Sequence, residues 1–355
     1  MGRWKQGSWL GAISQSWQLL QQRFLVSNTL RAFSLLFATG LSLSLLVASC
    51  SPSSTTTSAA SPGATAGSQA KVIRVGYQKS ATVLNVLKNQ RSLEKRLQPE
   101  GVNVEWNEFA AGPQMLEALN VGSIDFAYTG ETPPVTAQAA GTPLVYIASE
   151  AANPGSEAIL VLNDSPIKSV ADLKGKKVAL NKGSNVHYLL VRALEAARLQ
   201  YTDIETAFLP PGDARPAFEQ GKVDAWVIWD PFYAAAEKNG ARILVDGKDL
   251  VPNRGFFFSR QAFASQNPEL IKTFIDEANK ASTWAKGNRS GVADILSKSM
   301  GIDKAVLEIA EKRKDYGLSP LSDEVIADQQ KIADSFYKLK IIPKETNVAE
   351  VVWKG

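Results

Sequence analysis

Residues that could bind an anion gather at two glycine-containing turns, each placed where an apolar run gives way to helical spacing. They are Thr129-Gly130-Glu131 and Lys182-Gly183-Ser184-Asn185. Glycine lets the backbone approach a ligand closely, and the free N–H groups of a first helical turn attract negative charge. Each turn could equally be an ordinary helix start, with Thr132 or Ser184 as its cap.

Two further turns carry polar side chains in the same position. Gly112-Pro113 opens a helical pattern with Gln114 in its first turn, and Trp229-Asp230-Pro231 ends an apolar run before another helix. Gln114 could reach a cleft or lie on the surface. Aspartate before proline is typical of a helix cap, and Trp229 could line a pocket or pack in the core. Because open α/β sheets bind ligands where strands end, all four turns are candidate contacts.

The only histidine, His187, lies near the start of a predicted helix. The positive end of the helix dipole disfavours a charged imidazole, so we expect a neutral ring. Its N–H could face a ligand or be satisfied inside the core. With one histidine and one cysteine, the chain cannot form a zinc or iron–sulfur site from several such ligands. No nucleophile with a base and an orienting partner is evident. We therefore expect no catalytic residue, metal or cofactor.

Charge is distributed unevenly along the chain. Residues 1–49 contain Arg3, Lys5, Arg23 and Arg31 and no acidic residue, which accounts for the whole formal charge of +4. The remainder carries as many acidic as basic residues, so nucleic acid is not an expected partner.

The N-terminal segment has the pattern of a secretion signal. An apolar run from Ala32 to Val47 follows Arg31 and ends in Ala48-Ser49-Cys50. The run is shorter than the ~20 residues of a spanning helix and has the size of a signal-peptide core. The motif resembles a bacterial lipoprotein signal, in which residues 1–49 are removed and Cys50 is lipidated. The alternative is an uncleaved anchor. Small uncharged residues over 51–70 predict that 50–70 is a disordered tether.

From Lys71 onward, short β-branched runs alternate with helical spacing. The predicted strands cover 72–77, 102–107, 124–129, 144–148, 158–162, 177–180, 223–229 and 242–245, and 268–339 is mostly helical. Such alternation predicts an α/β fold with parallel-rich sheets. Breaks at Asn153-Pro154-Gly155 and Val251-Pro252-Asn253 predict two crossings between lobes. Lobe 1 would be 71–155 with 252–355, and lobe 2 would be 156–251.

A set of short motifs, taken in order, resembles the aliphatic sulfonate-binding proteins of bacterial ABC importers. The motifs are GYQK at 76–79, AGPQMLEAL at 111–119, GSID at 122–125, TGE at 129–131, DLKGKKVA at 172–179, KGS at 182–184 with His187, and WDP at 229–231. The resemblance extends from about Lys71 to Trp353.

This resemblance implies a two-lobe periplasmic binding protein fold, with a ligand cleft between two parallel-rich sheets flanked by helices. It implies a monomer that captures an alkanesulfonate, a small organic anion, and delivers it to an ABC permease with ATPase subunits. The expected location is the periplasm, with a lipid anchor to the membrane at Cys50. The implied ligand contacts are Gln78, Lys79, Gln114, Thr129, Gly130, Glu131, Ser184, Asn185, His187, Trp229 and Asp230.

The chain departs from the family pattern at two places that could change the pocket. The family usually has aspartate where Glu131 stands and serines where Asn185 and Val186 stand. Related branches bind taurine, nitrate, bicarbonate or pyrimidines, so another small anion or solute is an alternative ligand. Pyrimidine-synthase-like enzymes share the fold, but their cysteine-rich motif is absent here, because Cys50 lies in the signal region. We therefore expect a binding protein rather than an enzyme.

Overall fold

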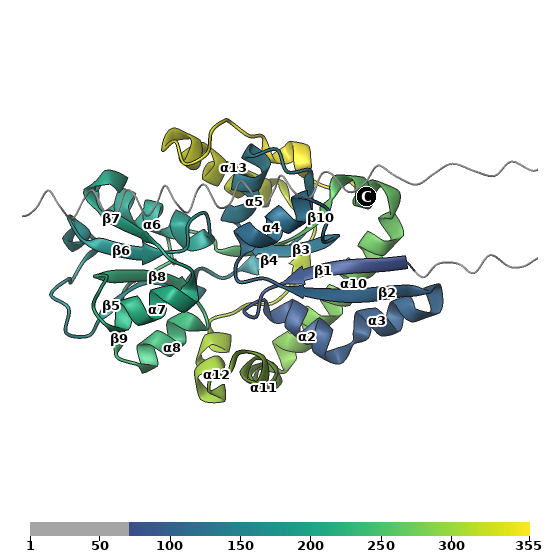
Figure 1. Cartoon of the computed structure of the whole chain (residues 1–355), viewed down its shortest axis with the longest axis horizontal. Helices are drawn as coiled ribbons and strands as arrows, with labels where there is room; N and C mark the ends of the chain where they lie inside the picture. Colours follow the sequence, from purple (N-terminus) through teal and green to yellow (C-terminus); the bar gives the residue numbers. More distant parts are fainter. Residues whose placement is uncertain (1–70) are drawn as a thin grey trace, which may run out of the picture. The chain divides into compact units, whose positions relative to one another are not determined.

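The computed structural model describes residues 71–355 (Figure 1). The predicted signal peptide (1–49), the predicted lipidation site Cys50 and the predicted tether (50–70) lie outside the described residues. Within 71–355, no helix is both long enough and apolar enough to cross a membrane.

The strands form two separate sheets. The first has the order β11-β4-β10-β3-β1-β2 and the second has the order β7-β6-β8-β5-β9. The first sheet contains β1 (Lys71–Tyr77), β2 (Val102–Glu108), β3 (Phe126–Gly130), β4 (Leu144–Ala152), β10 (Arg254–Arg260) and β11 (Leu318–Ser319). The second contains β5 (Glu157–Leu162), β6 (Lys177–Leu180), β7 (Glu205–Phe208), β8 (Ala225–Trp229) and β9 (Ala241–Asp246). The chain therefore crosses between the sheets after β4 and again after β9.

Both sheets are mixed rather than parallel-rich. β1 pairs in parallel with β2 and β3, and β6 pairs in parallel with β7 and β8. β10 and β11 pair antiparallel with their neighbours in the first sheet, and β5 does so in the second. A parallel pair needs a long crossover that is usually helical. No α-helix lies between β4 and β5 or between β9 and β10. Strands β5 and β10 can therefore run antiparallel to their neighbours in the sheet.

Helices cover the sheets and follow most strands directly. Those attached to the first sheet are α2 (Thr82–Gln90), α3 (Ser92–Leu97), α4 (Gly112–Asn120), α5 (Thr132–Ala139), α9 (Gln261–Gln266), α10 (Pro268–Gly287), α11 (Arg289–Met300), α12 (Lys304–Lys312) and α13 (Asp323–Lys338). Those of the second sheet are α6 (Asn185–Ala196), α7 (Pro211–Glu219) and α8 (Phe232–Lys238). Short 3₁₀ helices cover Gln98–Glu100, Pro154–Ser156, Val170–Leu173, Tyr201–Asp203 and Val348–Val351.

Strand β10 contains three successive phenylalanines, Phe256 to Phe258. Phe256 and Phe258 belong to the core that contains residues of α4, α5 and α13, whereas Phe257 belongs to the core that contains residues of α2 and α10. Successive strand residues point to opposite faces of a sheet. Because helices cover both faces, both sets of side chains must be apolar.

Strand β7, helix α7 and the helical region after β1 depart from the apolar patterns that predict the other elements. β7 and α7 have no clear apolar period, because β7 is an edge strand with half-buried and exposed residues and α7 contains Pro211 and Pro216. Leu84, Leu87, Leu93 and Leu97 have the spacing of a single helix, but the helix is broken at Arg91, whose φ of 54° ends α2 before α3 begins. A left-handed residue cannot continue an α-helix.

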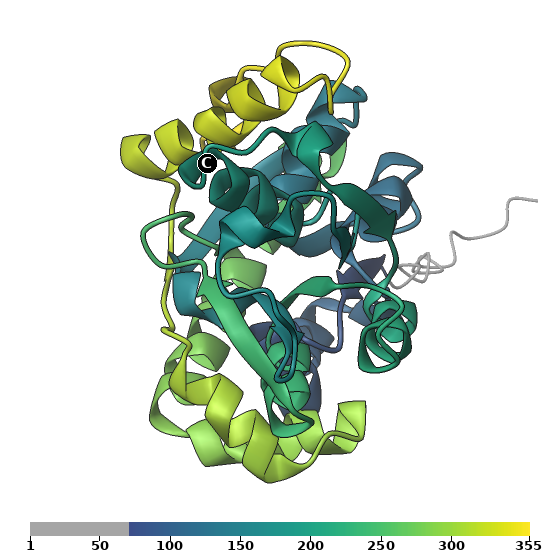
Figure 2. The same ribbon diagram turned by 90° about the vertical axis from the view of Figure 1, so that its left-hand side faces the viewer.

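The C-terminal segment of the first sheet contacts helices of the second sheet on two sides (Figure 2). At the lower side in this view, Val306 and Ala310 of α12 pack against Ala234 and Ala235 of α8. At the upper side, Phe336 of α13 lies against α6, with its ring centroid 5.2 Å from that of His187. The second sheet is therefore held between α12 and α13.

Candidate functional site

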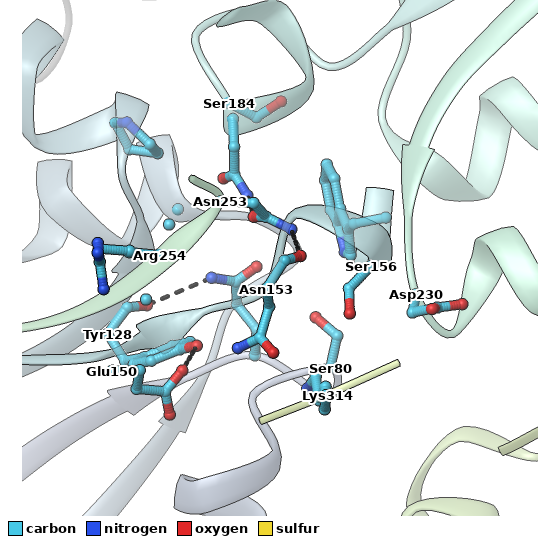
Figure 3. Close-up of a pocket in the computed structure, with 17 residues that line it drawn as sticks. Ser80, Tyr128, Glu150, Asn153, Ser156, Ser184, Asp230, Asn253, Arg254 and Lys314 are labelled. Carbon is cyan, nitrogen blue, oxygen red and sulfur yellow. Dashed lines mark hydrogen bonds between the residues drawn. The ribbon is translucent and has the colours of Figure 1, made fainter. Parts of the chain in front are cut away.

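A cavity of about 80 Å³ lies where strands of both sheets end (Figure 3). Six of the predicted contacts line it, namely Gln78, Gly130, Ser184, Asn185, Trp229 and Asp230. The sequence-based reasoning missed eleven other lining residues: Ser80, Gly112, Tyr128, Pro133, Glu150, Asn153, Ser156, Asn253, Arg254, Gly255 and Lys314. The cavity is therefore built from both sheets and from the two crossing segments between them.

Five helix starts surround this cavity. Ser80 precedes α2, Gly112 begins α4, Pro133 lies in the first turn of α5, Ser184 precedes α6, and Asp230 lies just before α8. They meet because each helix follows a strand that ends at the cavity. Free N–H groups and the positive ends of the helix dipoles favour a negatively charged ligand at such a place.

The two helix caps expected from the sequence are not made by the predicted hydroxyls. Ser184 is the N-cap of α6, but its Oγ donates to the carbonyl oxygen of Asn181 at 2.7 Å and accepts no hydrogen bond from the N–H groups of the helix. Thr132 is itself the first residue of α5, and its buried Oγ has no hydrogen-bond partner in the described chain. The first-turn N–H groups of α6 are therefore not covered by Ser184, whereas α5 has fewer to cover, because Pro133 and Pro134 carry no N–H.

Asp230 hydrogen-bonds to the first turn of α8 from one position before the cap, because Pro231 and not Asp230 is the N-cap of this helix. Its Oδ1 accepts a hydrogen bond from the N–H of Ala234 at 3.0 Å, and both oxygens lie 3.2 Å from Arg313. Burial raises the pKa of Asp230 to about 6, although Arg313 acts in the opposite direction. Trp229 is half-buried beside it and lines the cavity. The carboxylate of Asp230 is therefore already hydrogen-bonded within the protein, even though it lies on the cavity wall.

Three predicted contacts lie outside the cavity lining. Lys79 pairs with Glu108, with 3.5 Å between the ammonium nitrogen and the carboxylate oxygen. Gln114 is exposed on α4. Thr129 is fully buried, and its Oγ donates to the carbonyl oxygen of Gly130 at 2.8 Å. None of these side chains therefore presents a donor to the cavity.

His187 also lies outside the cavity lining, as a buried core residue. Its Nδ1 accepts from the N–H of Gly183 at 3.2 Å, so Nε2 carries the proton and donates to Tyr201 Oη at 2.7 Å. Burial lowers the pKa of His187 to about 4, and the charge of Lys182 acts in the same direction. The ring is neutral, as expected, but both nitrogens are occupied within the protein.

Glu131 is close to the cavity without lining it. It is fully buried, its Oε2 accepts from the N–H of Arg254 at 3.0 Å, and its Oε1 has no hydrogen-bond partner in the described residues. Burial raises the pKa of Glu131 to about 7, against the hydrogen bonds from the backbone of Arg254 and Asn253. Glu157 of β5 is equally buried, and burial together with the charge of Glu131 raises its pKa well above the usual range.

The basic residues of the lining come from parts of the chain that the sequence-based reasoning did not consider. Arg254 is the first residue of β10, and its buried Nε has no hydrogen-bond partner within residues 71–355. Lys314 follows α12 and donates to Thr82 Oγ1 at 2.6 Å. Arg254 directly follows the second predicted crossing, and this proximity is the one sequence signal that could have identified it.

The rest of the lining is dominated by neutral donors and acceptors. Gln78 donates to the carbonyl oxygen of Tyr128 at 3.3 Å, and Tyr128 donates to Glu150 Oε2 at 2.5 Å (Figure 3). Burial raises the pKa of Glu150, while Lys314 and Tyr128 lower it. The lining contains neither histidine nor cysteine, and no group of three potential metal ligands occurs in the described part of the chain. This arrangement of hydrogen-bonding groups therefore suits the binding of a ligand.

A sequence-family comparison gives a match to the family described as NMT1/THI5 like, over residues 97–289. A protein of Escherichia coli (strain K12) named for binding aliphatic sulfonates is 44% identical over 291 residues, which cover 81% of this chain and 91% of that protein. A protein of Bacillus subtilis (strain 168) with the same name is 35% identical, over 80% of this chain and 86% of its own length.

A solved structure shows the same architecture. The alkanesulfonate-binding protein SsuA from Xanthomonas axonopodis pv. citri, bound to MOPS, is 41% identical and superimposes with a TM-score of 0.77. The match covers 79% of this chain and 98% of that one.

The buried carboxyl of Glu131 predicts a pH dependence of stability. Its pKa is about 7 in the folded protein, compared with the ordinary value of 4.5 for a glutamate side chain. Between these values the folded state binds more protons than the unfolded state, so the free energy of unfolding falls as the pH rises from about 5 to 7. Glu131→Gln removes this titration and should reduce that fall by roughly 1–3 kcal/mol.

Urea unfolding at pH 5, 6, 7 and 8 measures this change. Glu108→Gln is the matched control, because Glu108 is a carboxyl paired with Lys79 outside the cavity. An equal fall of stability with pH in the wild-type protein and Glu131→Gln would contradict the prediction.

Proposed function

Because the chain belongs to the NMT1/THI5-like family and, within it, to the aliphatic sulfonate-binding proteins, we propose that it captures an aliphatic sulfonate in the cavity between its two sheets. It then delivers this anion to an ABC importer. The observation that carries the proposal is the meeting of five helix starts at one cavity that both sheets line. The chain is a binding protein of two-lobe fold and not an enzyme.

A sulfonate fits the chemistry of this cavity. It is a permanent monoanion with three acceptor oxygens and no donor. Helix starts supply N–H groups, and each contributes up to about 2 kcal/mol in a partly buried site. Charge-assisted hydrogen bonds contribute about 1.5–3 kcal/mol each. Micromolar affinity requires only about 8 kcal/mol, so a few such donors suffice after the cost of ordering.

The proposed setting follows from the relatives. An importer requires a permease and ATPase subunits as partners, and the protein works in the periplasm as a monomer. The signal-like segment ending at Cys50 supports secretion and a lipid anchor. The relatives named for binding aliphatic sulfonates support the ligand class, and a solved structure of the periplasmic aliphatic sulphonate binding protein SsuA from Escherichia coli, 43% identical to this chain, supports the periplasmic location.

We place the lobe boundaries at the two crossings. Lobe 1 consists of 71–155 and 252–355, and lobe 2 of 156–251. The distribution of strands supports this division, since all strands of the second sheet lie between Glu157 and Asp246. The hinge would then consist of the two crossing segments.

Ligand binding should close these lobes and contract the molecule. Small-angle scattering of the mature protein with and without saturating ethanesulfonate measures the radius of gyration, which should decrease. An unchanged radius under saturating ligand would argue against a clamp.

Sulfonates should stabilise the protein more than other small anions do. At a ligand concentration 100 times the dissociation constant, binding adds about 2.7 kcal/mol, which corresponds to a rise in Tm of roughly 5–10 °C. A thermal-shift panel of alkanesulfonates, taurine, nitrate and bicarbonate measures the preference. A large shift with nitrate and none with any sulfonate would refute the sulfonate assignment while leaving an anion receptor.

Two glutamines provide a matched pair for locating the site. Gln78 lines the cavity, whereas Gln114 is exposed on α4. Gln78→Ala should weaken binding of the preferred sulfonate about tenfold in calorimetric titration, and Gln114→Ala should leave it unchanged. Equal effects of the two substitutions would place the ligand elsewhere.

Cys50 should attach the protein to the membrane. In cells expressing the full chain, the wild-type protein should label with a radioactive fatty acid and sediment with membranes. Cys50→Ser should abolish the label and leave an unprocessed or soluble protein. A wild-type protein that is cleaved elsewhere and carries no lipid would exclude the anchor.

A further inference from the structure

Asn185 and Gly130 meet across the cleft. Asn185 is the first residue of α6 on the second sheet, and Gly130 is the last residue of β3 on the first. A Cβ atom placed on Gly130 would lie only 1.9 Å from Asn185 Oδ1 and 2.4 Å from Asn185 Cγ. No side chain fits at Gly130 while Asn185 and the two lobes keep these positions, because real Cβ atoms do not approach so closely.

The amide group of Asn185 is held in place by partners at the crossings. Its Nδ2 donates to Asn253 Oδ1 at 2.7 Å and lies 3.4 Å from Glu157 Oε2. Asn253 in turn donates to the backbone carbonyl oxygen of Asn153 at 2.8 Å. Asn253 and Asn153 belong to the two segments that connect the sheets, so the position of Asn185 is tied to the hinge.

We propose that Asn185 is a specificity-determining residue, which limits how far the lobes close and thereby sets how much bulk the cleft accepts beside the sulfonate group. This inference rests on the proposed function. Asn185 and Gly130 both line the cavity, together with Pro133 in the first turn of α5. The amide therefore stands between the starts of α5 and α6, where an anion would be attracted most strongly.

Substitutions at Gly130 and at Asn185 should have different consequences for the contact between them. An added methyl group at Gly130 must either displace the Asn185 amide from its hydrogen bond with Asn253 or push the lobes apart. A shorter side chain at position 185 removes this obstacle and leaves more room beside the sulfonate group. The three atoms nearest to the hypothetical Cβ all belong to Asn185, so the effect of Gly130→Ala should depend mainly on that residue.

A double-mutant cycle tests the proposal, because residues in direct contact give non-additive effects. Calorimetric titrations with methanesulfonate and with the branched propane-2-sulfonate compare the wild-type protein, Gly130→Ala, Asn185→Ala and the double variant. Gly130→Ala should weaken binding of methanesulfonate at least tenfold. The double variant should bind it within about threefold of Asn185→Ala. Asn185→Ala should also shift the affinity ratio toward propane-2-sulfonate at least fivefold.

Gly112 supplies the matched control, because it lines the same cavity. A Cβ at Gly112 would meet Pro133 and Thr129, which both belong to the first lobe. Any loss of affinity in Gly112→Ala should therefore persist when Asn185→Ala is added. If Gly130→Ala does not fold, Asn185→Gln introduces the same crowding from the other side and should also weaken binding at least tenfold.

The outcomes separate the inference from the proposed function. Unchanged affinity in Gly130→Ala, or a loss that Asn185→Ala does not rescue, overturns the role of Asn185 while sulfonate binding stands. A wild-type protein that binds no sulfonate overturns the proposed function. The cycle is then repeated by thermal unfolding of the four proteins without ligand. If adding Asn185→Ala does not restore the Tm lost in Gly130→Ala, the contact between the two residues is also overturned.

Discussion

The two crossing segments are bound to each other, and the position of everything around the cavity depends on that attachment. The N–H of Asn153 donates to the carbonyl oxygens of Pro252 and Asn253, and the side chain of Asn253 returns a hydrogen bond to the carbonyl oxygen of Asn153. Asn153 Oδ1 also accepts from the N–H of Asp315. These groups are largely buried, and a buried polar group left without a partner costs about 1–3 kcal/mol. The segments must therefore stay paired wherever the lobes move.

With the crossing segments fixed in this way, the order of strands and helices determines the electrostatic potential of the cleft. The strands β1, β2, β3, β6 and β8 end at the cavity, and each is followed by a helix that starts there, so positive dipole ends accumulate. The buried carboxyls of Glu131 and Glu157 stand behind this surface, and burial raises the pKa of both. When protonated they add no negative charge near the ligand, which is compatible with binding an anion at a site rich in acidic residues.

The sequence predicted the secondary structure around the site better than the site itself. Strand ends and helix starts follow from apolar periodicity and from Gly and Pro, so the turns at Gly130 and Ser184 were located correctly on the chain. Which side chains face the cavity depends on packing that no local pattern records. Lys79 was the expected cation, but it pairs with Glu108, and Arg254 and Lys314 line the cavity instead. His187 is turned into the core by Gly183 and Tyr201, and its spacing could not distinguish the two orientations.

The placement of α12 and α13 on either side of the second sheet bears on how long a ligand stays bound. Phe336 packs against His187 on one side, and Arg313 pairs with Asp230 and stacks on the Tyr233 ring, 3.9 Å from its centroid, on the other. A rotation about the crossings that frees one of these contacts presses on the other, so wide opening requires breaking at least one. The barrier to opening then enters the dissociation rate directly. Affinity differences among ligands of this protein would accordingly be expressed as differences in residence time more than in association rate.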